Sequence, residues 1–127
     1  MRIIEPSIII GRTGDKLTSI SVAMPVKVER SFDGSLKVNL PLFGTHSWAN
    51  DENGVEKAVE AEVILFCRGA EKFGDGIEKE LQYLGWKMVS VKDEVRVFAY
   101  RVSNTDVRLA GMLRKDPNHF NRRLEIT

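Results

Sequence analysis

The amino-acid sequence predicts an α+β fold, with one long and one shorter helix packed on one face of a mostly antiparallel sheet. Three observations lead to this prediction. The first forty residues contain short apolar runs and alternating patterns separated by turn residues, which is typical of strands. From Asn53 the apolar spacing changes to three and four, the period of a helix. After Gly85, β-branched and aromatic residues return. Strands and helices in separate blocks indicate an α+β protein.

Length and charge predict one domain with a basic tail. The 127 residues suit a single hydrophobic core, and 43% hydrophobic with 29% charged residues are ordinary for a globular domain. The net charge is only +1, but residues 101–127 hold six basic and three acidic residues. We therefore predict a single α+β domain over residues 1–103 and a basic C-terminal extension over residues 104–127.

The first two strands are predicted at residues 3–10 and 17–23, separated by the Gly-rich turn GRTGDK. Pro25 follows, and because proline has no N–H to donate, it is expected at a strand start, an edge or a bulge. The dipeptide Asp33-Gly34 then predicts a hairpin with a type I′ turn. In the strand after it, every second residue is apolar and should face the core: Leu36, Val38 and Leu40.

A long helix is predicted from residue 55 to residue 73, capped by Asp51 or Asn53. One stripe of this helix is apolar, and three further residues widen it at mid-helix, so we expect burial on more than one side. The stripe consists of Val55, Ala58, Val59, Val63, Phe66, Ala70 and Phe73, and it is widened by Ile64, Leu65 and Cys67.

A shorter helix should bury Ile77, Leu81 and Leu84 and end at Gly85. Two strands, WKMVSV and EVRVFAYRV, follow and are joined at Lys92-Asp93. Residues 106–113 are compatible with two helical turns and residues 116–118 with a turn, whereas HFNRRLEIT remains ambiguous.

The segment from Val26 to Phe73 joins the string VKVERSFDGSLKVNLPLFG, a polar loop and the helix VEKAVEAEVILF. This pattern resembles the HicB-like antitoxin domain, which has a strand before an Asp-Gly turn, a strand running into Pro and Gly, and a Glu- and Ala-containing helix. The resemblance implies a β-β-β-α-β core, related to part of the ribonuclease H fold, with extra elements in this chain. It also implies a non-enzymatic protein-binding module that neutralises a small ribonuclease toxin.

Trp48 lies in the polar stretch THSWANDEN, which we interpret as a loop joining the sheet to its covering helix. A large aromatic residue in such a loop either anchors the loop to the core or forms part of a partner-binding surface. The same stretch contains His46, Ser47 and Asp51, which leaves a small hydrolase or nuclease as an alternative. The spacing of the histidines does not match a metal site, and we expect no cofactor.

The basic extension suggests a second alternative, in which Arg114, Lys115, Arg122 and Arg123 bind nucleic acid. The competing interpretation is a solvated tail, or a tail that docks on its own domain or on the second subunit of a homodimer. The longest dense apolar run, AEVILFC, is too short to span a membrane, and the N-terminus does not match a secretory signal. Cys67 is the single cysteine and is expected to be a buried apolar residue in a cytoplasmic protein.

Overall fold

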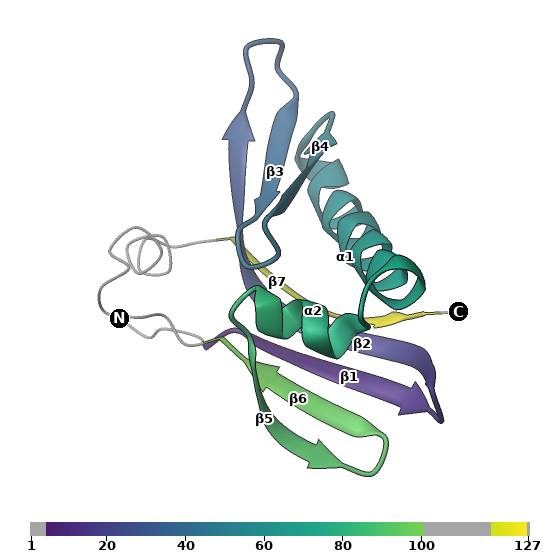
Figure 1. The fold of residues 1–127 in the computed structure, drawn as a ribbon. Helices are drawn as coiled ribbons and strands as arrows, with labels where there is room; N and C mark the ends of the chain where they lie inside the picture. Colours follow the sequence, from purple (N-terminus) through teal and green to yellow (C-terminus); the bar gives the residue numbers. More distant parts are fainter. Residues whose placement is uncertain (1–4, 101–117, 127) are drawn as a thin grey trace.

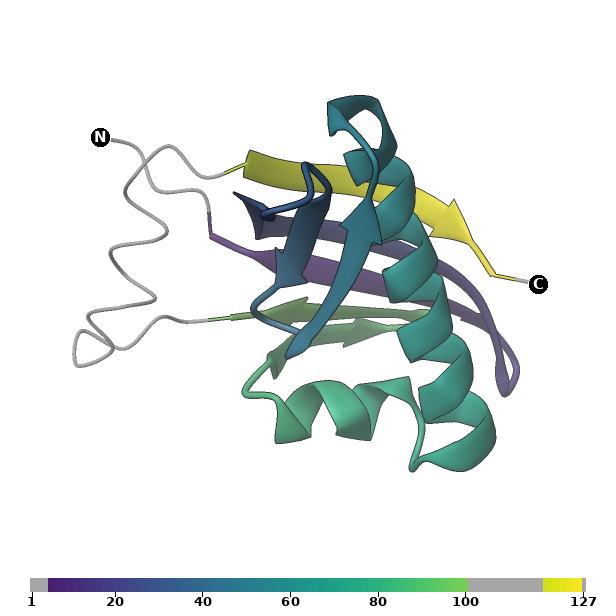
Figure 2. The same ribbon diagram turned by 90° about the horizontal axis from the view of Figure 1, so that it is seen from above.

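The computed structural model describes residues 5–100 and 118–126, and these residues form an α+β fold (Figures 1 and 2). The predicted fold class is confirmed, with one long and one shorter helix beside an antiparallel sheet. The strands are β1 (Ser7–Thr13), β2 (Lys16–Arg30), β3 (Leu36–Leu40), β4 (Thr45–Ala49), β5 (Lys87–Lys92), β6 (Val95–Ala99) and β7 (Asn118–Glu125). The helices are α1 (Val55–Phe73) and α2 (Ile77–Tyr83), with a short 3-10 turn at Glu52–Gly54.

The strands follow the order β4-β3-β2-β1-β6-β5, and every neighbouring pair is antiparallel. Strand β2 is long enough to pair with strands in two parts of the sheet. It pairs with β1 from Lys16 to Ala23 and with β7 from Ser19 to Val26, and its last four residues pair with β3. As a result the β2–β3–β4 part stands up from the rest of the sheet, and α1 packs in the angle between them (Figures 1 and 2).

Pro25 lies inside β2, so the predicted end of the second strand at residue 23 is wrong. The last residue of β2 that pairs with β1 is Ala23, and the first that pairs with β3 is Lys27. Pro25 therefore falls between the β1 and β3 ladders, although it lies within the β7 ladder, opposite His119. Met24, Pro25 and Val26 are all buried in succession, which breaks the alternation at the bend of the strand.

The hairpin at Asp33-Gly34 is confirmed, but its turn is not type I′. The N–H of Gly34 donates to the carbonyl of Ser31 at 3.0 Å, and only Gly34, with φ of +89°, has the left-handed conformation there. This is a type I turn followed by a left-handed glycine, the usual form of the slightly longer hairpin loop. The Asp33 side chain accepts from the backbone N–H of Ser35 at 3.0 Å, which stabilises the loop.

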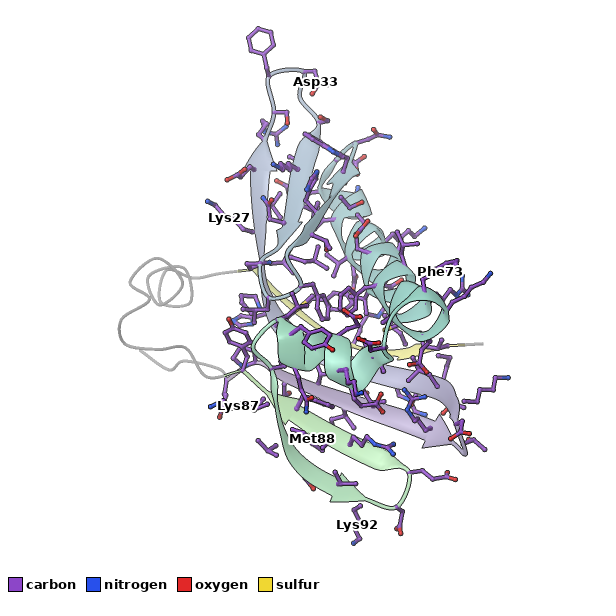
Figure 3. All side chains as sticks on the ribbon, in the orientation of Figure 1. Lys27, Asp33, Phe73, Lys87, Met88 and Lys92 are labelled. Carbon is purple, nitrogen blue, oxygen red and sulfur yellow. The ribbon has the colours of Figure 1, made fainter. Side chains whose placement is uncertain are left out.

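Helix α1 has the predicted bounds, and its core stripe is largely confirmed. Ala58, Val59, Val63, Cys67 and Ala70 are buried. Two predictions on this helix are wrong, because Leu65 is 65% exposed and Phe73 is 83% exposed. The sheet and α2 cover one side of α1 only, so the added apolar residues face outward. Figure 3 shows Phe73 pointing away from the body of the protein.

Helix α2 buries Ile77 and Leu81 as predicted, and Gly85 ends the turn after it with a φ of +102°. The next residue, Trp86, is 1% exposed, and its indole N–H donates to the carbonyl of Leu42 at 3.0 Å. The return from α2 into β5 is thereby tied to the segment between β3 and β4.

The C-terminal residues that the structure describes are part of the sheet. Strand β7 pairs with β2 from Asn118 to Glu125, and Phe120, Leu124 and Ile126 are buried in the core. This part of the predicted extension therefore belongs to the domain. The predicted boundary at residue 103, the helical turns at 106–113 and the start of the turn at 116–118 lie outside the described residues. Within those residues, no helix has the length and apolar character needed to cross a membrane.

Candidate functional site

The stretch THSWANDEN, predicted to be a loop, begins with strand β4. Trp48 pairs with Lys37 and His46 pairs with Asn39 across the β3–β4 ladder. Side chains that face each other across a ladder share one face of the sheet. Because Leu36, Val38 and Leu40 point into the core, these four side chains point outward, on the face opposite α1. We call this surface the Trp48 face, made up of Lys27, Glu29, Lys37, Asn39, His46 and Trp48.

Trp48 is 53% exposed, so the expectation that it anchors a loop to the core is wrong. The imidazole ring of His46 lies edge-on to the indole ring, with 6.3 Å between ring centroids and 86° between planes. Two aromatic rings are thus held next to each other on the surface of the sheet. An exposed Trp at such a place is the residue type most enriched at energetic centres of protein interfaces.

The charges on the Trp48 face are mostly compensated. The ammonium of Lys27 lies 3.0 Å from the carboxylate of Glu29, and the hydrogen bond from Lys27 lowers the pKa of Glu29. Lys37 stands between Glu29 and Trp48 in the ladder and has no ion pair within the part of the chain that is described. Figure 3 shows Lys27 on the side of β2 away from α1. The face is therefore polar around its aromatic pair.

The residues of the hydrolase alternative do not converge. Ser47 alternates with His46 along β4 and pairs with the buried Val38, so the two side chains lie on opposite faces. The Asp51 side chain accepts the backbone N–H of Gly54 at 3.1 Å and caps the turn before α1. Among the described residues no group of three or more His, Cys, Asp or Glu could hold a metal ion.

Cys67 is fully buried, as predicted from its place in the apolar stripe. Burial, with a smaller effect of the Glu71 carboxylate, raises the pKa of the thiol to about 12. The side chain is therefore a neutral thiol near pH 7 and packs as an apolar group.

Arg122 and Arg123, the two arginines of the predicted basic extension that the structure describes, lie on opposite faces of β7 and do not form one basic patch. Arg122 pairs with Val22 and faces α1, where its guanidinium contacts the carboxylates of Glu56, at 3.1 Å, and Glu60. The next residue, Arg123, points to the opposite face and pairs with Glu125 at 3.1 Å. Arg114 and Lys115 lie outside the described residues.

A second surface was missed by the sequence analysis. An open groove of about 390 Å³ runs between α1, α2 and the start of β4. Leu65 and Phe73 form its apolar rim, although the sequence assigned both to the core. The signal that could have found it is Gly69, an unfavourable residue in the middle of a helix. The groove is lined by Thr45, Glu62, Leu65, Phe66, Gly69, Ala70, Phe73, Gly74 and Glu80.

Comparisons with protein-family models, with curated proteins and with solved structures find no match to this chain.

Proposed function

We propose that this protein is a non-enzymatic module that acts by binding another protein through the Trp48 face. The observation that carries the proposal is the 53% exposure of Trp48 on an ordered strand. An indole ring buries roughly 200 Å² when fully covered, so covering the exposed half would contribute about 2–3 kcal/mol. The surrounding polar residues suit the rim of an interface.

The β5 edge of the sheet disfavours pairing with a strand of another chain. Strand β5 lies at one end of the sheet, and its pairing with β6 skips Val89, which forms a bulge. Lys87 and Lys92 stand at the two ends of this strand (Figure 3). Bulges and lysines are the devices by which natural edge strands resist pairing with another chain. The other end strand, β4, which carries Trp48, has no lysine and no bulge in its pairing with β3.

The resemblance of residues 26–73 to the HicB-like antitoxin domain supports the same proposal and suggests the partner. These residues include the last part of β2, all of β3 and β4, and α1. In that family the module neutralises a small toxin. We therefore propose a small basic protein as the partner and a homodimer of this chain, in the cytoplasm, as the binding form.

The proposal is tested by using the full chain as bait in a native lysate of its source organism. We expect a small basic protein to be recovered in stoichiometric amount. The Trp48→Ala variant should lose the partner, with an affinity at least ~30-fold lower, since 1.4 kcal/mol corresponds to a factor of ten. Met88→Ala, which truncates a 41% exposed side chain on β5, is the matched control and should retain it.

Fluorescence identifies the contact directly. Trp86 is buried, so quenching by acrylamide reports mainly on Trp48 in the free protein. Adding the recovered partner should protect Trp48 from the quencher and shift its emission to shorter wavelength. Recovery of the bait alone, or equal recovery by wild type and Trp48→Ala, would contradict the proposal.

A further inference from the structure

We infer that the groove beside α1 is a second binding site, which accepts an amphipathic helix carrying lysine or arginine from a partner protein. The groove lies on the helix side of the sheet, whereas the Trp48 face lies on the opposite side. The inference is therefore independent of the function proposed for Trp48. Three features of the groove lead to it: an apolar rim, a glycine with no packing role, and acidic residues at both ends.

The rim of the groove is an apolar ridge with a gap in its middle. Leu65, Gly69 and Phe73 are four residues apart and so lie one above another along α1. The two outer side chains are 65% and 83% exposed. Phe66 forms part of the floor and stacks on Phe43 of the core, with 4.9 Å between ring centroids. The floor is thus rigid, while the ridge presents two projecting side chains.

Gly69 has no packing role within residues 5–100 and 118–126. A Cβ atom added to it would meet no atom within 4 Å. A glycine in the middle of a helix costs roughly 0.5–1 kcal/mol relative to alanine. Residues that destabilise the fold without packing against anything are expected at functional sites. Here the missing side chain lets the backbone of another helix approach α1 closely, as small residues do at helix crossings.

The ends of the groove are acidic. Glu62 lies two turns before Gly69 on α1, and the carboxylate of Glu80 lies beside Gly74. Neither carboxylate has an ion pair within the described part of the chain, which sets them apart from Glu56, Glu60, Glu71 and Glu78. With a rise of 1.5 Å per residue, Glu62 lies roughly 18 Å along α1 from Gly74, where the Glu80 carboxylate lies. An occupant with a basic residue toward each end would match them.

The same charges argue against a second copy of this chain as the occupant. Two α1 helices packed antiparallel about Gly69 would bring Leu65 of one copy onto Phe73 of the other. The same rotation would place Glu62 of one copy near Glu80 of the other, so that like charges meet at both ends. A basic helix from a different protein avoids this repulsion.

The lining also holds an unused polar group. The Oγ1 atom of Thr45 is buried and lacks a hydrogen-bond partner, and it is the one such side-chain atom among the described residues. Buried hydroxyl groups are normally paired, because an unpaired one costs about 1–3 kcal/mol. Thr45 lies where β4 meets the groove, but its Oγ1 atom has almost no exposed surface and so takes no part in contact with the occupant.

The test uses the full chain and a synthetic helical probe. The probe is an acetylated and amidated alanine-based peptide of about four turns, with a central Leu and two Lys about three turns apart on the same face. A matched peptide carries Glu in place of both Lys. We expect the Lys peptide to bind at least ~10-fold more tightly, a difference of 1.4 kcal/mol. Amide chemical shifts should change between residues 62 and 73 and at residue 80.

Variants of the full chain separate the groove from the fold. Gly69→Ala is expected to leave the protein folded and to weaken binding of the Lys peptide by about 5–10-fold, since a methyl group then fills the gap. Leu65→Ala should weaken it similarly, and Glu62→Lys should remove the preference for the Lys peptide. Val91→Ala, a control at a 56% exposed apolar residue on β5, should bind as the wild type does.

Three results would overturn the inference. One is equal binding of the Lys and Glu peptides, or no saturable binding at millimolar concentration. Another is unchanged affinity in Gly69→Ala and Leu65→Ala. The third is a dimer in sedimentation equilibrium that both variants dissociate, which would assign the groove to a second copy. Because Trp48→Ala should not affect peptide binding here, failure of this site is distinguishable from failure of the Trp48 face.

Discussion

Arg12 joins three elements through its guanidinium group. From β1 it donates to the carboxylate of Glu71 on α1 at 2.6 and 2.9 Å, and to that of Glu78 on α2 at 2.7 and 2.6 Å. Its side chain is only 10% exposed. The planar guanidinium suits such double contacts, which a lysine could not make. Glu71 also accepts the backbone N–H of Ile77 at 2.9 Å, so the cluster secures the start of α2.

The two carboxylates make this cluster sensitive to pH. Hydrogen bonds from Arg12 lower the pKa of Glu71. Burial raises the pKa of Glu78, but Arg12, a backbone N–H and Arg96 together outweigh that effect and the net shift is downward. A carboxyl group whose pKa is lower in the folded state stabilises the fold above its unfolded pKa, near ~4.3, and loses that contribution as the pH falls.

We predict that Arg12→Met lowers the free energy of unfolding at pH 7 by about 2 kcal/mol, because two partly buried carboxylates then face each other without the cation. The deficit relative to wild type should shrink below about pH 4.5, where both carboxyl groups become protonated. Urea denaturation between pH 3 and pH 7 measures both values. Arg68→Met, at an exposed position on α1, is the control and should change stability by less than ~0.5 kcal/mol.

At the scale of elements, glycines with equally open surroundings have opposite roles. A Cβ atom added to Gly34 or to Gly69 would meet nothing within 4 Å. Gly34 has φ of +89° in the β2–β3 turn, a conformation that other residues adopt only at a cost, whereas Gly69 is in an ordinary helix. The backbone angle, and not the available space, therefore decides what a methyl group does.

We predict that Gly34→Ala lowers the free energy of unfolding by about 1 kcal/mol and that Gly69→Ala raises it by about 0.5–1 kcal/mol. The two variants add the same group, so each is the control for the other. The midpoint of urea denaturation should move down for the first and up for the second, with unchanged slopes. Destabilisation by Gly69→Ala would show that the glycine has a packing role within this chain.

At the scale of the whole molecule, β7 connects the end of the chain to a strand about one hundred residues earlier. Phe120 pairs with Met24 and Leu124 with Ile20, and all four side chains are in the core. Arg122 holds the same strand to α1 through Glu56 and Glu60. The strand therefore links the sheet to its covering helix.

We predict that a chain ending before β7 does not fold stably. Removing Phe120, Leu124 and Ile126 removes roughly 6 kcal/mol of apolar burial, which is comparable to the total stability of a small domain. The milder variant Leu124→Ala should remain folded but lose about 2–3 kcal/mol. Arg123→Ala, at a 67% exposed side chain, should be neutral. Thermal unfolding, monitored by circular dichroism, compares the truncated chain with Leu124→Ala and Arg123→Ala. A cooperative transition in the truncated chain would contradict the prediction.

Residue patterns within a single segment were sufficient to predict most of the helices and strands. The alternation of Leu36, Val38 and Leu40 and the period of α1 depend on neighbours only a few residues away. Strand β4 was missed because its inward residues, Thr45, Ser47 and Ala49, are small or polar and show no apolar alternation. It is a strand because β3 offers it a ladder, which is a tertiary effect.

The candidate sites also depend partly on local sequence and partly on tertiary packing. Trp48 was identified from its residue type, but its exposure depended on β4 being a strand with α1 on the other side. The groove was missed because the side of a helix that is covered depends on which elements pack on it. Periodicity alone could not place Leu65 and Phe73 outside.

The sequence by itself determined the class of fold, the bounds of α1 and the hairpin at Gly34, because these depend on local periodicity and on the backbone freedom of single residues. Only the tertiary structure decided the single bent β2, the docking of β7 and the outward faces that carry Trp48 and Gly69. Each of these depends on pairing or packing between segments far apart in the chain. Local sequence patterns carry no information about the energies of such contacts.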